Sequence, residues 1–127
     1  MARTWSAELT VVGLQFRWKK DGRETLARAV PFKVELEREP DNKYDENAVK
    51  VNIVSDFKLT KLRGKQLGYL RANIAALLAD KLDKGTVEPV KLWVTEIDVL
   101  DGTAQLSARF RDVAKPVTKP KRKVSRR

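Results

Sequence analysis

The residues best equipped for chemistry lie in one polar loop, residues 39–47, with the sequence E-P-D-N-K-Y-D-E-N. The carboxylates in and beside this loop include Glu37, Glu39, Asp41 and Asp45. Such a cluster could hold magnesium for a small nuclease, although the EF-hand pattern fails at Lys43 and lacks its glycine and final glutamate. In a purely structural alternative, Asp45 accepts hydrogen bonds from main-chain N–H groups and Tyr44 covers the core.

Histidine and cysteine are both absent from the sequence. Ser-His and Cys-His nucleophile systems are therefore excluded, as are disulfide scaffolds and the usual zinc ligand sets. The side chain most often used for proton transfer near neutral pH is missing as well. We therefore expect a binding protein without catalytic chemistry of its own and without a cofactor.

The net charge of +10 is unevenly distributed along the 127 residues. Residues 114–127 contain seven basic side chains and no acidic ones, which leaves 20 basic against 17 acidic side chains, or +3, in residues 1–113. A chain of this length suits one folded domain. We predict a domain over 1–113 and a disordered basic tail over 114–127, which could contact nucleic acid, direct localisation or aid solubility.

Several short motifs occur in a specific order along the chain. They are Val12-Gly13, Glu39-Pro40, Asn42, the run from Tyr44 to Val51, and Leu67-Gly68-Tyr69-Leu70. Their order resembles the HIRAN domain over roughly residues 8–98. The resemblance implies an OB-like β-barrel, known from DNA-repair and fork-remodelling helicases, that holds the 3′-hydroxyl end of single-stranded DNA.

By this resemblance, Tyr44 packs on the terminal base or sugar, Asp45 accepts the 3′-hydroxyl proton, and Asn47 orders the loop. The chain departs from helicase-borne members after Leu14, where Gln15-Phe16-Arg17 replaces a basic residue followed by two aromatics. It has no P-loop or other motor signature, so the resemblance implies action alone or with a helicase or nuclease on another chain. Alternatively, the chain is a protein-interaction module that recruits or inhibits such an enzyme.

The chemistry of these side chains agrees with that role. A hydroxyl that donates to an ionised carboxylate forms a charge-assisted bond of about 1.5–3 kcal/mol, and only the end of a strand keeps such a hydroxyl. Aromatic rings can each add about 1–3 kcal/mol of base stacking, although an isolated aromatic in a strand is by default a core residue. The stacking candidates are Phe16, Tyr44 and Tyr69, and the cationic candidates are Arg17, Lys43, Arg71 and the run Lys61–Lys65.

Hydrophobic patterning predicts a mainly β chain with one main α-helix. The helix runs from about Arg71 to Lys84, with leucine and isoleucine at helical spacing and Gly85 at its end. Its start, near Asn73, offers free N–H groups that could seat a phosphate. The other expected elements are a strand over 7–18, a hairpin or loose loop at 19–24, strands over 32–37, 49–54 and 66–70, a basic connector over 58–65, and a hairpin of 90–99 with 103–110. We predict a small, partly open OB-like barrel.

No stretch approaches the roughly 18 apolar residues of a membrane span, and residues 1–16 lack the features of a secretory signal. We therefore expect an intracellular protein, in the cytoplasm or nucleoid, or in the nucleus of a eukaryote, without a membrane partner. The expected partner is single-stranded DNA with a free 3′ end, in repair, replication or restart.

Overall fold

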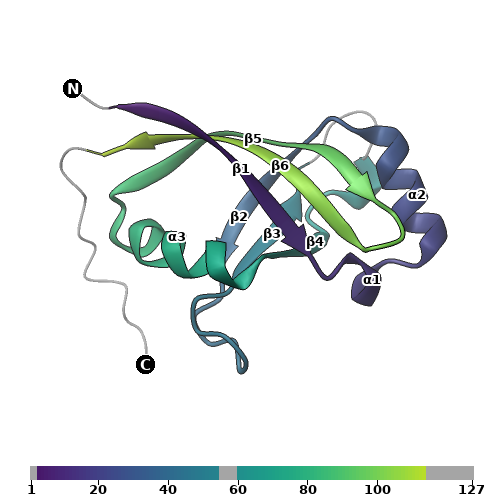
Figure 1. The fold of residues 1–127 in the computed structure, drawn as a ribbon, viewed down its shortest axis with the longest axis horizontal. Helices are drawn as coiled ribbons and strands as arrows, with labels where there is room; N and C mark the ends of the chain where they lie inside the picture. The colour runs from purple at the N-terminus through teal and green to yellow at the C-terminus, as the bar shows by residue number, and fades with distance from the viewer. Residues whose placement is uncertain (1–2, 55–59, 114–127) are drawn as a thin grey trace.

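The computed structural model describes residues 3–54 and 60–113, in which six antiparallel strands close into a barrel (Figure 1). The order around the barrel is β1-β4-β3-β2-β5-β6. The strands are β1 (Thr4–Val12), β2 (Phe32–Arg38), β3 (Val49–Ile53), β4 (Gln66–Leu70), β5 (Val87–Asp98) and β6 (Thr103–Asp112). The helices are α1 (Leu14–Arg17), α2 (Lys20–Ala29) and α3 (Ala72–Lys84), with a 3-10 turn η1 (Thr60–Leu62). The mainly β, OB-like class with one main helix is confirmed.

Two short ladders complete the ring. Strand β1 pairs with β4 only at Val11↔Leu70 and Val12↔Tyr69, and β2 pairs with β5 only at Phe32↔Val94 and Lys33↔Trp93. The expected partly open barrel is therefore a closed one in which β2 and β5 part soon after they meet. The predicted basic tail, 114–127, and the beginning of the predicted connector at Lys58 lie outside the described residues.

The core follows the predicted alternation. Phe32 and Val34 are buried while Lys33 and Glu35 are exposed, so β2 turns one face to the barrel interior. Helix α3 lies against β2 and β5 and buries a face of small and aliphatic residues, namely Ala75, Leu78 and Ala79. Each large aliphatic side chain removed from water in this way contributes about 1.5–3 kcal/mol. No helix in the described part of the chain is long and apolar enough to cross a bilayer.

The predicted strand over 7–18 is wrong in its second half, because β1 ends at Val12 and residues 14–17 form α1. Gly13 adopts φ 86°, a left-handed conformation that turns the chain out of the strand. Leu14 is then fully buried, and the Trp18 amide donates to the Leu14 carbonyl at 2.8 Å. Burial of Leu14 therefore overrides the strand propensity of the aromatic residues that follow it.

The predicted loop at 19–24 is also wrong, since it forms the first half of α2. The Asp21-Gly22 pair indicated a turn, but Gly22 lies inside the helix, where a Cβ would be 3.2 Å from Trp18 Cε3. The glycine allows the indole to approach. Arg23 fixes the helix by donating from Nε to the Val99 carbonyl at 2.7 Å and from Nη1 to the Trp18 carbonyl at 2.8 Å.

The short β1–β4 ladder depends on close approach at Gly68. A Cβ at this position would collide with the main-chain oxygen of Val12 and lie 3.1 Å from Val11 Cγ1. We predict that Gly68→Ala lowers the free energy of unfolding by about 1–3 kcal/mol, as overpacking does, in urea denaturation. The control Ser107→Ala, on a half-exposed site of β6, should change it by less than about 0.5 kcal/mol; equal values for both variants would refute the tight approach.

Candidate functional site

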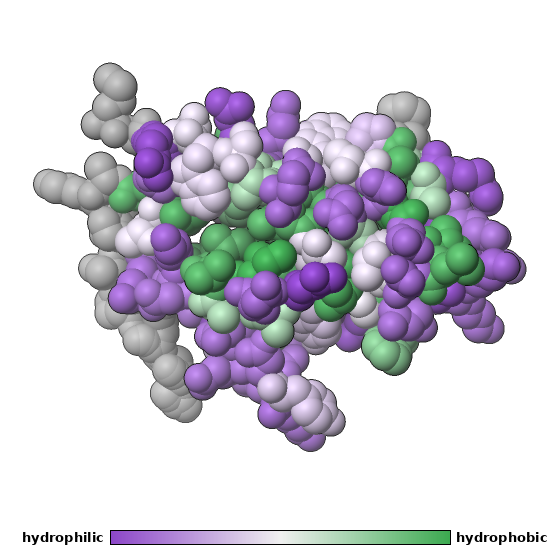
Figure 2. All heavy atoms as spheres, in the orientation of Figure 1, coloured by the Kyte–Doolittle hydropathy of each residue, from purple (hydrophilic) through white to green (hydrophobic). Residues whose placement is uncertain are grey.

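The loop of residues 39–47 connects β2 and β3 and projects from the barrel as a hydrophilic arm (Figures 1 and 2). The side chain of Asn42 organises it. Its Oδ1 accepts hydrogen bonds from the amides of Tyr44 at 2.8 Å and Asp45 at 3.0 Å, while its Nδ2 donates to Glu39 Oε1 at 2.7 Å. One side chain thus ties Glu39 to the main chain at Tyr44 and Asp45, so the backbone of this part of the loop is held in place before any ligand arrives.

Asp45 divides its carboxylate between structure and solvent. Oδ1 accepts the amide of Asn47 at 2.9 Å, and the Asp45 carbonyl accepts the amide of Ala48 at 3.0 Å. Oδ2 has no hydrogen-bond partner among residues 3–54 and 60–113, and the side chain is only half-buried. The structural interpretation of Asp45 therefore applies to Oδ1, whereas Oδ2 is available to a hydrogen-bond donor.

Arg38 anchors the far end of the loop and was not singled out from the sequence. Its Nη1 donates to the Ala48 carbonyl at 2.7 Å, and its Nη2 to the Glu46 carbonyl at 2.9 Å. The same guanidinium pairs with both carboxylate oxygens of Asp83 in α3, at 2.8 and 3.1 Å. Because its side chain is only 16% exposed, this bidentate pair ties the loop firmly to the helix. Nothing in the sequence indicates that an arginine at the end of a strand of alternating apolar and polar residues would anchor a loop to a helix.

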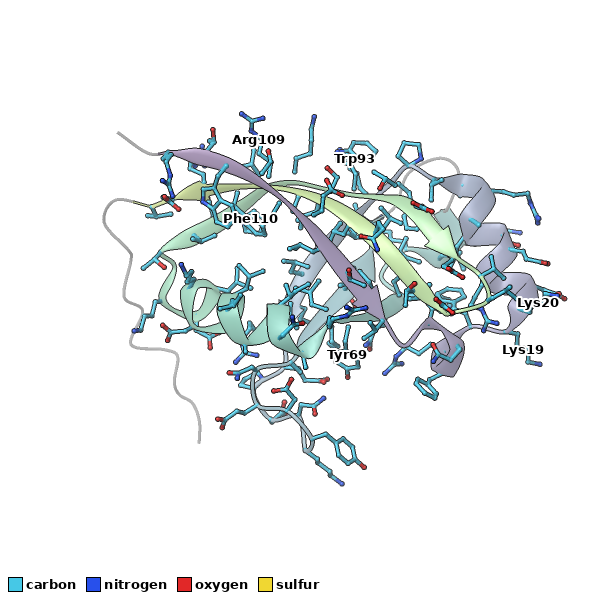
Figure 3. The ribbon with its side chains drawn as sticks, viewed as in Figure 1. Lys19, Lys20, Tyr69, Trp93, Arg109 and Phe110 are labelled. Carbon is cyan, nitrogen blue, oxygen red and sulfur yellow. The ribbon has the colours of Figure 1, made fainter. Side chains whose placement is uncertain are left out.

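Tyr69 lies between the loop and α1 and contacts a residue of each (Figure 3). Its hydroxyl donates to Glu39 Oε1 at 2.7 Å, and the Arg17 guanidinium lies 5.9 Å from its ring centroid. Hydrogen bonds from Asn42 and then Tyr69, with the Lys50 charge, hold the pKa of Glu39 below its ordinary value. The ionised Glu39 in turn fixes the Tyr69 ring, so the Tyr69 hydroxyl is committed to structure and its ring to the pocket.

These residues surround a pocket of about 260 Å³. It is lined by Val12, Asn42, Tyr44, Asp45, Ala48, Tyr69, Leu70 and Ala72. Three predicted site residues, Tyr44, Asp45 and Tyr69, therefore meet at one cavity. Ala72 brings the first turn of α3 to the same wall, and that helix has no side-chain cap at its start.

The start of α3 leaves donors for an anion. The amides of Ile74 and Ala75 donate to the Arg71 carbonyl at 2.9 Å, whereas those of Ala72 and Asn73 have no acceptor in the described part of the chain. Free N–H groups at the positive end of a 13-residue helix attract phosphate or carboxylate groups. The predicted phosphate seat near Asn73 therefore adjoins the pocket.

The remaining predicted residues lie around or away from the pocket. Phe16 is 84% exposed on α1, and Arg17 and Lys43 are exposed beside Tyr69 and Tyr44 respectively. Asn47 contributes its main-chain amide to the loop, which the side chain of Asn42 also ties together, and the ordering role that the resemblance gives to Asn47 stays a prediction. Arg71 lines a different hollow, which it shares with the carboxylates Glu96, Asp98 and Asp101.

The carboxylates near the loop do not converge on a metal site. Glu37 and Glu39 both face Lys50, whose Nζ lies 3.6 and 3.7 Å from their Oε2 atoms. Across the described residues there is no group of three or more acidic side chains able to hold an ion. The nuclease alternative, which needs such a group, gains no support from the geometry.

Comparison with known proteins identifies a family. The sequence of residues 6–101 matches the family model of the HIRAN domain. The Helicase-like transcription factor of Oryctolagus cuniculus is 48% identical over 50 residues, which are 39% of this chain and 4% of that protein. The crystal structure of the HIRAN domain of human HLTF superposes with a TM-score of 0.67 and 26% identity, covering 89% of this chain and 81% of that one. A crystal structure of a protein from Lactobacillus plantarum gives 0.62 and 25%, covering 87% and 97%.

The Asn42 network predicts a pH effect. Asn42→Ala should raise the pKa of Glu39 toward its ordinary value, because the largest stabilisation of the ionised carboxylate is lost. A carboxylate with a lowered folded pKa stabilises the fold above its unfolded pKa and loses that contribution as pH falls through the folded pKa, so the Glu39 contribution should shrink. NMR titration of the carboxyl carbons measures this. Asn47→Ala should leave the Glu39 pKa unchanged, and an unchanged value in Asn42→Ala would exclude the network.

Proposed function

The chain belongs to the HIRAN domain family, a family of DNA-binding domains, and we propose that it binds the 3′-hydroxyl end of single-stranded DNA without catalysing a reaction. The observation that carries the proposal is the Oδ2 of Asp45, which has no hydrogen-bond partner in the described part of the chain and belongs to a pocket that Tyr44 and Tyr69 also line. The chain spans about 4% of the length of its curated helicase-like relative. Action beside a helicase or nuclease on another chain, in repair, replication or restart, is part of the proposal.

The Asp45 carboxylate makes sense at a DNA site only as an acceptor for a donor group. Phosphates repel a carboxylate, and the interaction of two like charges at about 4 Å costs on the order of 1 kcal/mol even in bulk water. A free 3′-hydroxyl repays that cost, since its bond to an ionised carboxylate is worth about 1.5–3 kcal/mol. An internal nucleotide has its 3′ oxygen in a phosphodiester and has no such donor to offer.

Rings and cations around the pocket supply the rest of the binding energy. Tyr44 is 95% exposed, so its ring is open to stack on the terminal base, at about 1–3 kcal/mol per stacked base. Phe16 on α1 is open to stack the preceding base in the same way. Arg17 and Lys43 flank the pocket and pair with phosphates, while Arg71 would reach only a strand that passes the start of α3.

Asp45→Asn is the sharpest test of end recognition, because the amide keeps an oxygen for the Asn47 N–H and removes the charge that accepts the hydroxyl. We expect affinity for a 3′-hydroxyl strand to fall roughly tenfold to a hundredfold, the equivalent of about 1.5–3 kcal/mol. Affinity for the same strand with a 3′-deoxy or 3′-phosphate end should hardly change. Fluorescence anisotropy measures all three.

The matched control is Asp41→Asn, which makes the same charge change at an exposed position of the same loop. Asp41→Asn should bind each strand as tightly as the wild-type protein does, or slightly more tightly. Equal loss on free and blocked ends in Asp45→Asn would reject the hydroxyl assignment, and so would a wild-type protein that binds all three ends with one affinity.

The basic tail should act by charge alone. Deleting residues 114–127, which carry seven basic side chains, should weaken binding to all nucleic acids alike and flatten the dependence of affinity on salt, because fewer counterions are released. Salt titrations of binding measure the slope. The preference for a free 3′ end should survive the deletion, and its loss would assign end recognition to the tail.

A further inference from the structure

The outer face of the barrel carries an unusual pair of like charges. Lys91 of β5 lies directly opposite Arg109 of β6 in the antiparallel ladder, and both are exposed. Like charges at opposed positions destabilise a sheet. Neither forms an ion pair within residues 3–54 and 60–113, and Arg109 has only a 3.3 Å hydrogen bond from Nη2 to Thr4 Oγ1. Arg111, the next outward cation on β6, is by contrast paired with Glu88 at 2.7 Å.

Trp93 joins these cations on the same face. Trp93 and Lys91 are two residues apart on β5, opposite Ser107 and Arg109, so the indole and both cations point outward together. On its other side Trp93 is paired with Lys33 of β2, whose ammonium lies 5.5 Å from the indole centroid. Lys33 likewise has no ion pair in the described chain. We name Lys33, Lys91, Trp93 and Arg109 the β5 surface.

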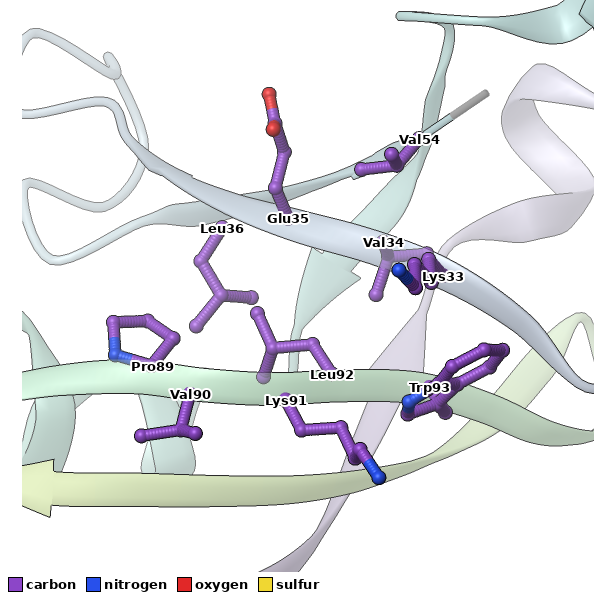
Figure 4. Close-up of a pocket in the computed structure, with 10 residues that line it drawn as sticks. All are labelled: Lys33, Val34, Glu35, Leu36, Val54, Pro89, Val90, Lys91, Leu92 and Trp93. Atoms are coloured by element: carbon purple, nitrogen blue, oxygen red, sulfur yellow. The ribbon is translucent and has the colours of Figure 1, made fainter. Parts of the chain in front are cut away.

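A groove runs beside the β5 surface because β2 and β5 separate. After Lys33↔Trp93 the two strands no longer pair, and a hollow of about 400 Å³ opens between them (Figure 4). Lys33, Lys91 and Trp93 stand on its walls, and Val90, 50% exposed, continues it. The carboxylate of Glu35 points away from the groove (Figure 4). The groove is thus lined by two cations, Lys33 and Lys91, by Glu35 and by apolar side chains.

We propose that the β5 surface is a second DNA contact, which binds the phosphate backbone and a base of the strand at a distance from its 3′ end. Three unpaired cations around a half-exposed indole match a polyanion that carries flat rings. Trp93 and Arg109 of this surface lie along the upper edge of the molecule, and Tyr69 lies well below them (Figure 3), so a strand held at both places passes around the barrel. The inference rests on the DNA binding proposed above but not on reading of the 3′-hydroxyl.

Two linked contacts make affinity depend on strand length. A tetranucleotide can fill only the pocket beside Asp45. A strand of about 16 nucleotides, the upper range for one OB-type domain, can reach both this pocket and the β5 surface, and it gains affinity because the two contacts are linked. Lys91→Gln with Arg109→Gln should weaken the long strand about tenfold and lower its salt slope by about 1.4, since each phosphate contact on a single strand contributes about 0.7. The tetranucleotide should bind as before.

The double variant is suited to this test because it removes a like-charge pair, and its Tm should equal or exceed that of the wild type. Arg28→Gln with Lys81→Gln is the matched control, since both side chains are exposed and lie on α2 and α3. The indole N–H signal of Trp93, assigned with Trp93→Phe, reports the contact directly. It should shift with the long strand and stay in place with the tetranucleotide.

Loss of long-strand affinity no greater than in the control pair would overturn the proposal. So would a Trp93 signal that responds to polyglutamate and not to DNA, which would make the β5 surface a dock for an acidic protein segment. Failure of end recognition is read separately, from tetranucleotides with hydroxyl and phosphate ends. If those bind equally while the double variant still weakens the long strand, the second contact stands and the 3′-end proposal falls.

Discussion

The candidate site depends on the side chain of Asn42, which connects the loop to the barrel. Its oxygen holds the amides of Tyr44 and Asp45, and its nitrogen holds Glu39, the acceptor for the Tyr69 hydroxyl. A projecting nine-residue loop would otherwise lose considerable conformational entropy on binding. With the Asn42 network formed, that entropy is lost on folding, and the main chain at Tyr44 and Asp45 and the side chain of Tyr69 are held in position.

The fold determines which charged side chains form ion pairs with each other. In the folded part basic and acidic groups nearly balance, and several cations are neutralised by neighbours, as Arg38 is by Asp83 and Arg111 by Glu88. Among the described residues, the cations without an ion pair include Arg17 beside Tyr69 and the three cations of the β5 surface, and others, such as Arg28 and Lys81, lie on the helices. Local pairing therefore indicates which cations are available to a polyanion, which the total of +10 does not.

The sequence allowed prediction of those elements in which one pattern decides the structure. The alternation in β2 and the apolar spacing in α3 gave correct elements, although Leu77 in the α3 pattern is 72% exposed. Helices α1 and α2 were missed because burial of Leu14 and packing of Trp18 on Gly22 are tertiary effects. Within the site, the motif indicated Tyr44 and Asp45, whereas Arg38 gave no signal, since its partners Ala48 and Asp83 meet it only in the folded chain.

The central claim is that one oxygen of Asp45 accepts a hydroxyl found only where a strand stops. The carboxyl ¹³C resonance of Asp45 in the wild-type protein tests it most directly, recorded at saturation with two strands that differ only in a terminal 3′-hydroxyl or 3′-hydrogen. We expect the resonance to move with the hydroxyl strand alone, while Tyr44 and Tyr69 signals respond to both. Identical shifts of Asp45 with the two strands, or none with either, would contradict the account.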